Sequence, residues 1–398
     1  MQTLFHDEVV PVPPMPHSGP ARMDLQRRFV QRLQVNPQLS RKLVSYQGNK
    51  EAVGFRWLKY KEGFSTALVR QFIERGAATQ VLDPFSGAGT TVLTAMGMGI
   101  PATGIEILPL GTLAAQTMAY AANGLPLAAF RTAAHALLHA IAKGDDDGQY
   151  GLAHVPITQG AFPVDADREI ARARQFIAAL TDPALVTALN LACMSVLEEV
   201  SYTRKDGQFL RWDPRSGRTV STKLNKGPLP SFATALDRRL QQMMQDFPLL
   251  KEHYAGPLPT FITGSSLIEL QKLDTGQFDC VVTSPPYANR YDYTRTYALE
   301  LVYMGYDDAQ IKALRQALLS ATVENRCKRT RLRTDWGDVP ALEHIFRMVD
   351  QQAALQEVLA ILRDRAAELS NRNVISLLEN YFTEMAVIVY ELGRVVRA

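Results

Sequence analysis

The spacing of apolar residues predicts alternating helices and strands over the first hundred residues of the chain. Met23 begins a stretch with helical periodicity and a basic face, and a second amphipathic helix is predicted from Phe64 to Arg75. The apolar run from Gln80 is typical of a strand that opens into a glycine-rich turn. A helix over 91–98 and a strand over 101–106 complete a β-loop-α-β unit.

The rest of the chain is predicted to be mainly helical, with one further strand. Helical patterns predominate from about Leu110 to Tyr254, except for a basic, turn-rich break over 201–230. Phe278 begins a short apolar strand before a Pro-Pro turn, and the last helix, which includes Tyr381, runs to the end of the chain. These patterns predict an α/β fold with a Rossmann-like sheet and a largely helical inserted lobe. Because such sheets continue after this helix, we expect the last strands to be lacking.

Composition and charge narrow the class of protein without naming a function. A chain of 398 residues has room for more than one lobe, because single cores stop growing near ~250–300 residues. The net charge of +3 is too small to identify a nucleic-acid partner by itself. The three cysteines lack CxxC spacing, so we expect no disulfide framework, no metal site and a reducing, cytoplasmic location. No run approaches the roughly 18 apolar residues of a membrane span, so no membrane partner is predicted.

The first motif with chemical content is VLDPFSGAGTT, which follows the predicted strand from Gln80. Gly87 and Gly89 allow a tight turn and a close approach to a ligand. Asp83 ends the strand, and Glu106 ends the next strand 23 residues later, a spacing that suits ribose hydroxyls. A glycine-rich turn by itself is as typical of an ordinary loop as of a ligand-binding site. Val92 replaces the third glycine of a dinucleotide-binding pattern and GK[ST] is absent, which favours a different adenosyl cofactor.

The second motif is TSPPY, at the predicted carboxyl end of the strand from Phe278. Consecutive prolines fix the turn, so that Ser284 Oγ and the Pro285 carbonyl can both be directed at one amino group. Tyr287 then offers a ring for stacking. By itself a Pro-Pro-Tyr segment is more typical of a simple loop or a polyproline helix.

Together the two motifs resemble the DPFxGxGT cofactor loop and the [SDN]PP[YF] catalytic loop of the DNA amino-methyltransferase family. The resemblance implies S-adenosylmethionine as cofactor, with GFSTALV from Gly63 near its methionine part. The cofactor-binding residues that it implies are Phe64, Ser65, Asp83, Pro84, Phe85, Gly87, Gly89, Thr90 and Glu106. The catalytic residues that it implies are Ser284, Pro285, Pro286 and Tyr287. Where the family usually has a Gly-Asp turn near the adenine, this chain has Gly264 and Ser265.

The resemblance also divides the chain and suggests the target base. It implies an N-terminal arm and helix (1–54), a cofactor-binding part (55–110), a helical and basic insert for target recognition (111–255) and a catalytic part with a helical extension (256–398). Ser284 in place of Asp or Asn favours N4 of cytosine over N6 of adenine. Methylation at C5 needs a thiolate, usually after a proline, and none of the three cysteines follows one.

Two basic runs are candidate contacts for double-stranded DNA, the partner that the resemblance implies. Residues 201–226 hold seven basic and two acidic residues, a local charge of +5, with aromatic residues between them. Residues 326–333 hold five basic residues and no acid. Without the motifs, such runs are more typical of a solvated face. The candidate DNA-binding residues are Arg204, Lys205, Arg211, Arg215, Lys328 and Arg329.

Other readings of the sequence remain open. Related catalytic loops methylate RNA or protein amino groups, so RNA or protein is an alternative substrate. The absent strands suggest either a second polypeptide that completes the sheet or a truncated, noncatalytic remnant that binds DNA or a partner. If the chain methylates DNA as part of a restriction-modification system, a cognate restriction nuclease is expected as a further partner.

Overall fold

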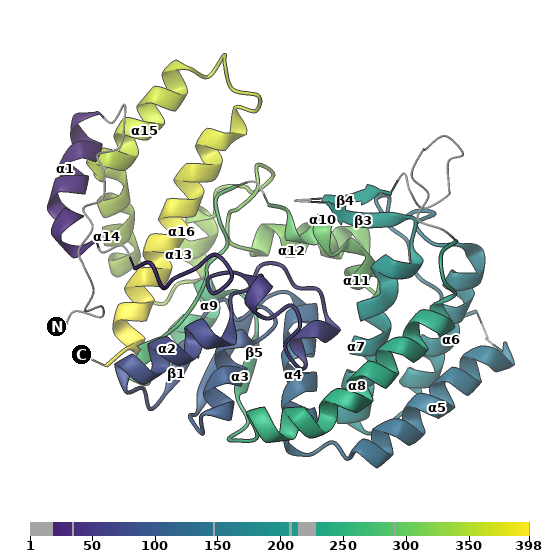
Figure 1. The fold of residues 1–398 in the computed structure, drawn as a ribbon. Coiled ribbons are helices and arrows are strands. Elements are labelled where there is room, and N and C mark those ends of the chain that lie inside the picture. Colours follow the sequence, from purple (N-terminus) through teal and green to yellow (C-terminus); the bar gives the residue numbers. More distant parts are fainter. Residues whose placement is uncertain are drawn as a thin grey trace.

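The computed structural model describes residues 19–33, 36–145, 148–206, 209–213, 228–289 and 291–397 (Figure 1). At its centre lies a four-stranded parallel sheet in the order β5-β2-β1-β6, with bounds Val81–Asp83 (β1), Ala102–Glu106 (β2), Thr260–Thr263 (β5) and Cys280–Val281 (β6). The chain moves from β1 outward to β2, and later returns to the other side of β1 as β6. Parallel sheets bind ligands where the strand order reverses in this way, at the carboxyl ends of the two strands.

The helices surround the sheet and build a lobe beside it (Figure 1). They are α1 (Pro20–Phe29), α2 (Thr66–Gly76), α3 (Thr90–Gly97), α4 (Pro109–Asn123), α5 (Leu127–Lys143), α6 (Val164–Ala178), α7 (Pro183–Val200), α8 (Phe232–Tyr254), α9 (Ser266–Glu269), α10 (Tyr293–Thr296), α11 (Ala298–Tyr303), α12 (Asp308–Ala317), α13 (Arg329–Asp335), α14 (Val339–Asp350), α15 (Ala353–Asp364) and α16 (Asn373–Val395). Short 3-10 helices are η1 (Val30–Arg32), η2 (Tyr46–Gly48), η3 (Phe55–Trp57) and η4 (Leu270–Lys272).

Alternate residues of the strands face two different cores. Val81 and Ala102 belong to a large core with α2, α3, α4 and α8. Leu82 and Ile105 point to the opposite face, where they pack with residues of α9, α14 and α16. This period of two is that of a strand buried on both faces, and it gives three layers with the sheet in the middle. The predicted Rossmann-like α/β fold with a helical lobe is confirmed.

The helical lobe shares the large core of the sheet. Helices α5 to α8 contribute to the same cluster of buried residues as α3 and β1. Helix α7 is long and apolar enough to cross a membrane, but it packs against α4, α6 and α8 as a core helix of a soluble protein does. Helix α4 contacts β2 and β5 and crosses the predicted division at residue 111. The division of the chain into four parts stays a prediction.

Three features of the fold were not predicted from the pattern of residues. One is the strand β5, which pairs with β2 at the edge of the sheet. The basic break of the insert contains an antiparallel hairpin, β3 (Thr203–Asp206) and β4 (Phe209–Trp212). Helices α14, α15 and α16 form an arm against which α1 packs, and Glu357 of α15 accepts a hydrogen bond from Ala21 N at 2.7 Å (Figure 1). After α16, Val396 forms an isolated parallel bridge with Phe278 at the edge of the sheet.

Candidate active site

The two predicted loops meet at the carboxyl ends of β1 and β6. Asp83 ends β1, and its Oδ1 accepts hydrogen bonds from Thr283 Oγ1 at 2.7 Å and from Phe85 N at 3.0 Å. Thr91 Oγ1 donates to the carbonyl of Val282 at 3.1 Å. Burial raises the pKa of Asp83 to about 6, although the hydrogen bond from Thr283 opposes that rise. The glycine-rich loop and the proline loop are therefore joined at one edge of the sheet.

The glycine-rich turn requires its glycines for conformation and for space. Gly87 and Gly89 have φ of +52° and +85°, in the left-handed region that side chains disfavour. A Cβ atom at Gly87 would lie 2.9 Å from the ring of Tyr60, and one at Gly89 would lie 2.5 Å from the Cβ of Ala115. No other residue type fits these two positions without moving its neighbours.

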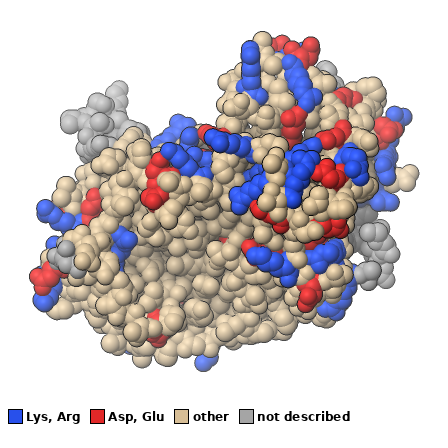
Figure 2. Space-filling model, turned by 180° about the vertical axis from the view of Figure 1, so that it is seen from behind, with Lys and Arg blue, Asp and Glu red and all other residues tan. Residues whose placement is uncertain are grey.

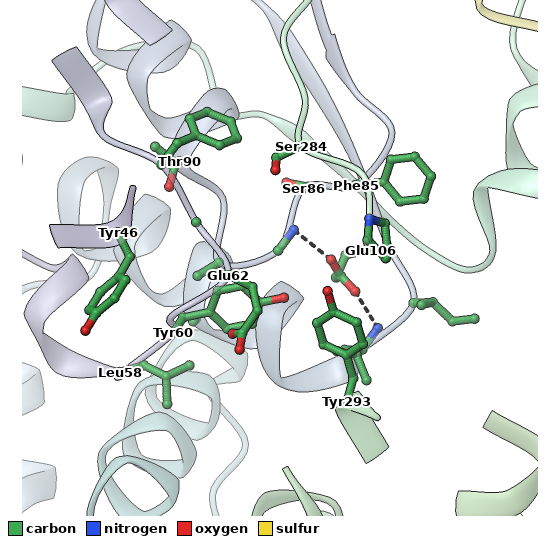
Figure 3. A pocket seen from close by; sticks show the side chains of 18 of the residues that line it. Tyr46, Leu58, Tyr60, Glu62, Phe85, Ser86, Thr90, Glu106, Ser284 and Tyr293 are labelled. Atoms are coloured by element: carbon green, nitrogen blue, oxygen red, sulfur yellow. Dashed lines mark hydrogen bonds between the residues drawn. The ribbon is translucent and has the colours of Figure 1, made fainter. Parts of the chain in front are cut away.

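Glu106, at the end of β2, holds this turn in place through its carboxylate. Its Oε2 accepts from Gly87 N at 2.6 Å and its Oε1 accepts from Leu108 N at 2.7 Å, as Figure 3 shows. Burial raises the pKa of Glu106 to about 7, and the backbone hydrogen bonds partly offset this rise. Each oxygen keeps a lone pair, so the carboxylate can still accept hydrogen bonds from a diol.

A cavity of about 280 Å³ lies above the turn and is lined from both loops (Figure 3). Ser284 faces it from the proline loop, and Glu106 faces it from the end of β2. Ser86 Oγ is buried in the lining and has no hydrogen-bond partner among the described residues. The predicted site residues that line it are Phe64, Pro84, Phe85, Gly87, Thr90, Glu106, Ser284 and Pro286.

The remaining five predicted residues lie next to the cavity without lining it. Ser65 caps α2 by accepting from Leu68 N at 3.2 Å, and it donates to the carbonyl of Leu43. Asp83 ties the loops together, Gly89 is the N-cap residue of α3, and Pro285 lies within the proline loop. Tyr287 is 63% exposed, so its ring is presented to solvent next to Ser284 and Pro286.

Several lining residues carried no recognised signal in the sequence. Tyr46, Tyr60 and Glu62 come from the segment before α2, where no helical or strand periodicity marks them. Glu62 accepts hydrogen bonds from the hydroxyls of Tyr291 and, at 2.5 Å, Tyr297. Ser265, in the turn after β5, also lines the cavity, as do Ser266 and Leu267 at the start of α9. The resemblance locates Gly264 and Ser265 at the place where the family usually has Gly-Asp, whereas Ser266 and Leu267 carry no signal in the sequence.

Most of the predicted DNA contacts are engaged within the protein, and two of them are corrected. Lys205 is buried and bonds Glu300 at 2.5 Å, and Lys328 is buried against Glu384 at 3.1 Å. Neither ammonium group is presented to a phosphate. Arg329 forms a bidentate pair with Asp350.

The other three candidates lie in or after the β3–β4 hairpin. Arg204 bonds Asp206 at 3.0 Å, and Arg211 is exposed on β4. Arg215 lies outside the described residues.

Ion pairs explain why the basic run over 326–333 is a poor guide to DNA contact. On the face shown in Figure 2, lysine and arginine side chains gather on one half, and acidic side chains lie among them. Arg333 pairs with Glu343 at 2.5 Å and Arg331 with Asp335 at 3.0 Å. Acids of α13 itself and of α14 therefore neutralise much of the local charge. Within the described ranges no group of three acidic, histidine or cysteine side chains is placed to hold a metal ion.

The glycine-rich turn after β1, the acid that ends β2 and the proline loop after β6 give this α/β fold the form of a Rossmann-like methyltransferase. The chain belongs to the type II methyltransferases. It is 37% identical over 406 residues to type II methyltransferase M.BsoBI of Geobacillus stearothermophilus, and the aligned region covers 94% of this chain and 77% of that protein. It is 35% identical over 388 residues to type II methyltransferase M.AvaI of Nostoc sp. and of Anabaena variabilis, and each alignment covers 94% of this chain and 78% of the relative. No family model and no solved structure matches it.

Proposed function

We propose that this chain transfers the methyl group of S-adenosylmethionine to an exocyclic base amine in double-stranded DNA, and that N4 of cytosine is preferred to N6 of adenine. It would then be the modifying enzyme of a cytoplasmic restriction-modification system with a cognate nuclease. One observation carries the proposal: the glycine-rich turn and Ser284 line a single cavity. The similarity to type II methyltransferases supports the same reaction class.

The lining of the cavity fits the proposed cofactor. Glu106 has lone pairs left for the two ribose hydroxyls, and the apolar side chains of Phe85 and Leu267 suit a purine ring. Ser86 Oγ is a buried polar atom without a partner among the described residues, and a ligand hydrogen bond would satisfy it. When bound, S-adenosylmethionine supplies an electrophilic methyl group.

The proline loop is suited to activate an amine. The lone pair of an exocyclic base amine is delocalised into the ring, so the amine is a poor nucleophile until it is held in a tetrahedral-like geometry. Ser284 Oγ and the Pro285 carbonyl would accept hydrogen bonds from its two N–H groups and stabilise the positive charge that develops. Tyr287, with 63% of its surface exposed, would stack on the extruded base.

The cysteines support direct transfer to an amine over a thiolate mechanism. None of the three lines the cavity. Cys193 is buried in α7, and burial raises the pKa of its thiol to about 12. Burial also raises the pKa of Cys280 in β6, while Cys327 is exposed. Methylation at C5 of cytosine therefore has no nucleophile in this site.

We place the phosphate contacts on the β3–β4 hairpin of the insert. Arg211 is exposed there, and its guanidinium lies 5.4 Å from the ring of Phe209. Arg204 on the neighbouring strand shares its charge with Asp206. An exposed guanidinium beside an aromatic ring on one short hairpin suits a DNA backbone and an unpaired base.

Mass spectrometry of nucleosides tests the proposal. Unmethylated duplex DNA is incubated with the protein and S-adenosylmethionine, digested and searched for N4-methylcytosine and N6-methyladenine. We expect N4-methylcytosine, and we expect Ser284→Ala to lower kcat by about tenfold to a hundredfold, the worth of one hydrogen bond to a charged group. Ser195→Ala, on α7 outside the cavity, is the matched control and should retain full kcat. N6-methyladenine alone would refute the base preference, and methylated tRNA without methylated DNA would favour the RNA alternative.

A further inference from the structure

Glu62 places a carboxylate in the cavity, and no basic residue that the structure describes forms an ion pair with it. It lines the cavity from the segment before α2 (Figure 3). The hydroxyls of Tyr291 and Tyr297 donate one hydrogen bond to each of its carboxylate oxygens. Over the described parts of the chain, no Lys, Arg or His nitrogen lies within 4.0 Å of this carboxylate. A half-buried carboxylate that faces a cavity, with no ionic partner among the described residues, favours a ligand that supplies the positive charge.

The basic residues that share the cavity lining have acidic partners elsewhere. Arg56 pairs with Asp246, the Lys59 ammonium lies 3.6 Å from Glu198, and Lys50 lies 3.9 Å from its neighbour in sequence, Glu51. These acids are outside the lining. The side chains that face the cavity without an ionic partner are therefore carboxylates, which favours a cationic ligand.

The carboxylate of Glu62 is held in a fixed direction. Tyr297 is only 1% exposed, its ring stacks on Tyr60 at 5.6 Å, and the Lys205 ammonium lies 4.3 Å from the ring centre. The phenol hydroxyl therefore has little freedom to turn away from Glu62. Because each oxygen accepts one phenol hydroxyl, each keeps lone pairs for a donor in the cavity. Preorganised acceptors of this kind bind a donor without the cost of ordering the side chain.

The other two carboxylates of the site are committed to different tasks. Both oxygens of Glu106 already accept backbone N–H groups at the turn, and its remaining lone pairs are assigned to ribose. Asp83 is 1% exposed, bonds Thr283 and Phe85, and does not line the cavity. Neither is available to an ammonium group that enters the cavity.

We propose that Glu62 is a cofactor-binding residue that accepts a hydrogen bond from the α-ammonium group of S-adenosylmethionine. The inference rests on the proposed function, since it assigns one end of the same cofactor. The ammonium is chosen over the sulfonium because the lone pairs of Glu62 call for an N–H donor, and a sulfonium has none. Tyr291 and Tyr297 are the positioning residues that direct the carboxylate.

Calorimetry with three ligands tests this assignment. The ligands are S-adenosylmethionine, S-adenosylhomocysteine, which has the ammonium but no sulfonium, and 5′-methylthioadenosine, which has neither. We expect Glu62→Gln to weaken the first two by at least about tenfold, the loss of one charge-assisted hydrogen bond, and to leave 5′-methylthioadenosine within twofold of the wild type. Glu62→Asp keeps the charge and should recover part of the loss. Glu51→Gln, at an exposed carboxylate outside the lining, is the matched control.

Each other outcome overturns the assignment in a recognisable way. Unchanged binding of the first two ligands refutes it, and weakening of S-adenosylmethionine alone transfers the role to the sulfonium. Equal weakening of all three ligands shows that the substitution damaged the cavity. If the wild type methylates DNA while Glu62→Gln binds normally, only the role of Glu62 fails. If the wild type neither binds S-adenosylmethionine nor methylates DNA, the proposed function fails with it.

Discussion

Removal of the Thr283 hydroxyl should destabilise the protein in a way that depends on pH. Thr283 Oγ1 donates to Asp83 Oδ1 at 2.7 Å, and Asp83 is 1% exposed. Thr283→Val keeps the shape of the side chain and removes this donor from a buried carboxylate. A hydrogen bond to a charged group contributes about 1.5–3 kcal/mol, whereas one between neutral groups contributes about 0.5–1.5 kcal/mol. The loss should therefore be larger when Asp83 is ionised.

The direction of the pH effect follows from the pKa of Asp83. Burial raises this pKa to about 6 in the folded protein, above the ordinary value of about 3.9 that applies when the chain is unfolded. Ionisation of Asp83 therefore costs stability as the pH rises from about 4 through 6, and the Thr283 hydroxyl limits that cost. Without the hydroxyl the folded pKa rises further. The destabilisation by Thr283→Val should be small at pH 5 and approach about 1.5–3 kcal/mol at pH 8.

Urea denaturation of the wild type and the variant at pH 5 and pH 8 measures this difference, with the midpoint compared at an unchanged slope. Thr283→Ser retains the hydroxyl and should behave like the wild type at both pH values. In a double-mutant cycle with Asp83→Asn, the pH dependence should disappear. Equal destabilisation at the two pH values would refute the reasoning, because it would mean that the ionised form of Asp83 does not depend on Thr283.

Three further outcomes are expected. Gly87→Ala should weaken S-adenosylmethionine binding at least about tenfold in calorimetry, because φ of +52° and the Tyr60 ring, 2.9 Å from the added Cβ, force the turn to shift. Unchanged affinity would contradict the proposed close approach of the turn to the cofactor. Affinity for S-adenosylmethionine should fall up to tenfold per pH unit below about 7, because Glu106 becomes protonated. The part of this pH dependence that Glu106→Gln removes is the contribution of Glu106. Identical pH profiles for the wild type and the variant would exclude a contribution of Glu106. Lys205→Met should lower the free energy of unfolding by about 3–5 kcal/mol, because it leaves Glu300 buried and unpaired. The double variant with Glu300→Gln should recover most of this loss. A loss below about 1 kcal/mol in thermal or urea denaturation would contradict the buried pair.

The main elements of the site were predictable because they depend on local motifs and on a rule of parallel sheets. Gly87 and Ser284 each follow a strand that periodicity identifies, Glu106 ends another, and parallel strands end at the same edge. The rest depends on contacts between distant segments. Glu62 enters the cavity because Tyr291 and Tyr297, more than 220 residues later, donate to it. No pattern within the segment before α2 records that contact.

The charged residues show the same limit more sharply. Lys205 and Lys328 stand in basic runs, and a count of neighbouring charges predicts that they face a polyanion. Their acidic partners, Glu300 and Glu384, lie 95 and 56 residues away in the sequence. A local count cannot include such partners, because only the tertiary fold brings them together. For this reason Arg211, exposed on β4, is a stronger candidate for a phosphate contact than either lysine.

The contact between Asp83 and Thr283 spans 200 residues of chain, and this separation affects how the protein is made. At about 5–20 residues per second, a ribosome needs roughly 10–40 s to extend from one partner to the other. During that interval β1 can pair with β2 but not with β6, so one edge of the nascent sheet stays open. Methyltransferase competence must therefore arise late in synthesis, and the growing polypeptide exposes a hydrogen-bonding edge that chaperones or neighbouring nascent chains can reach first.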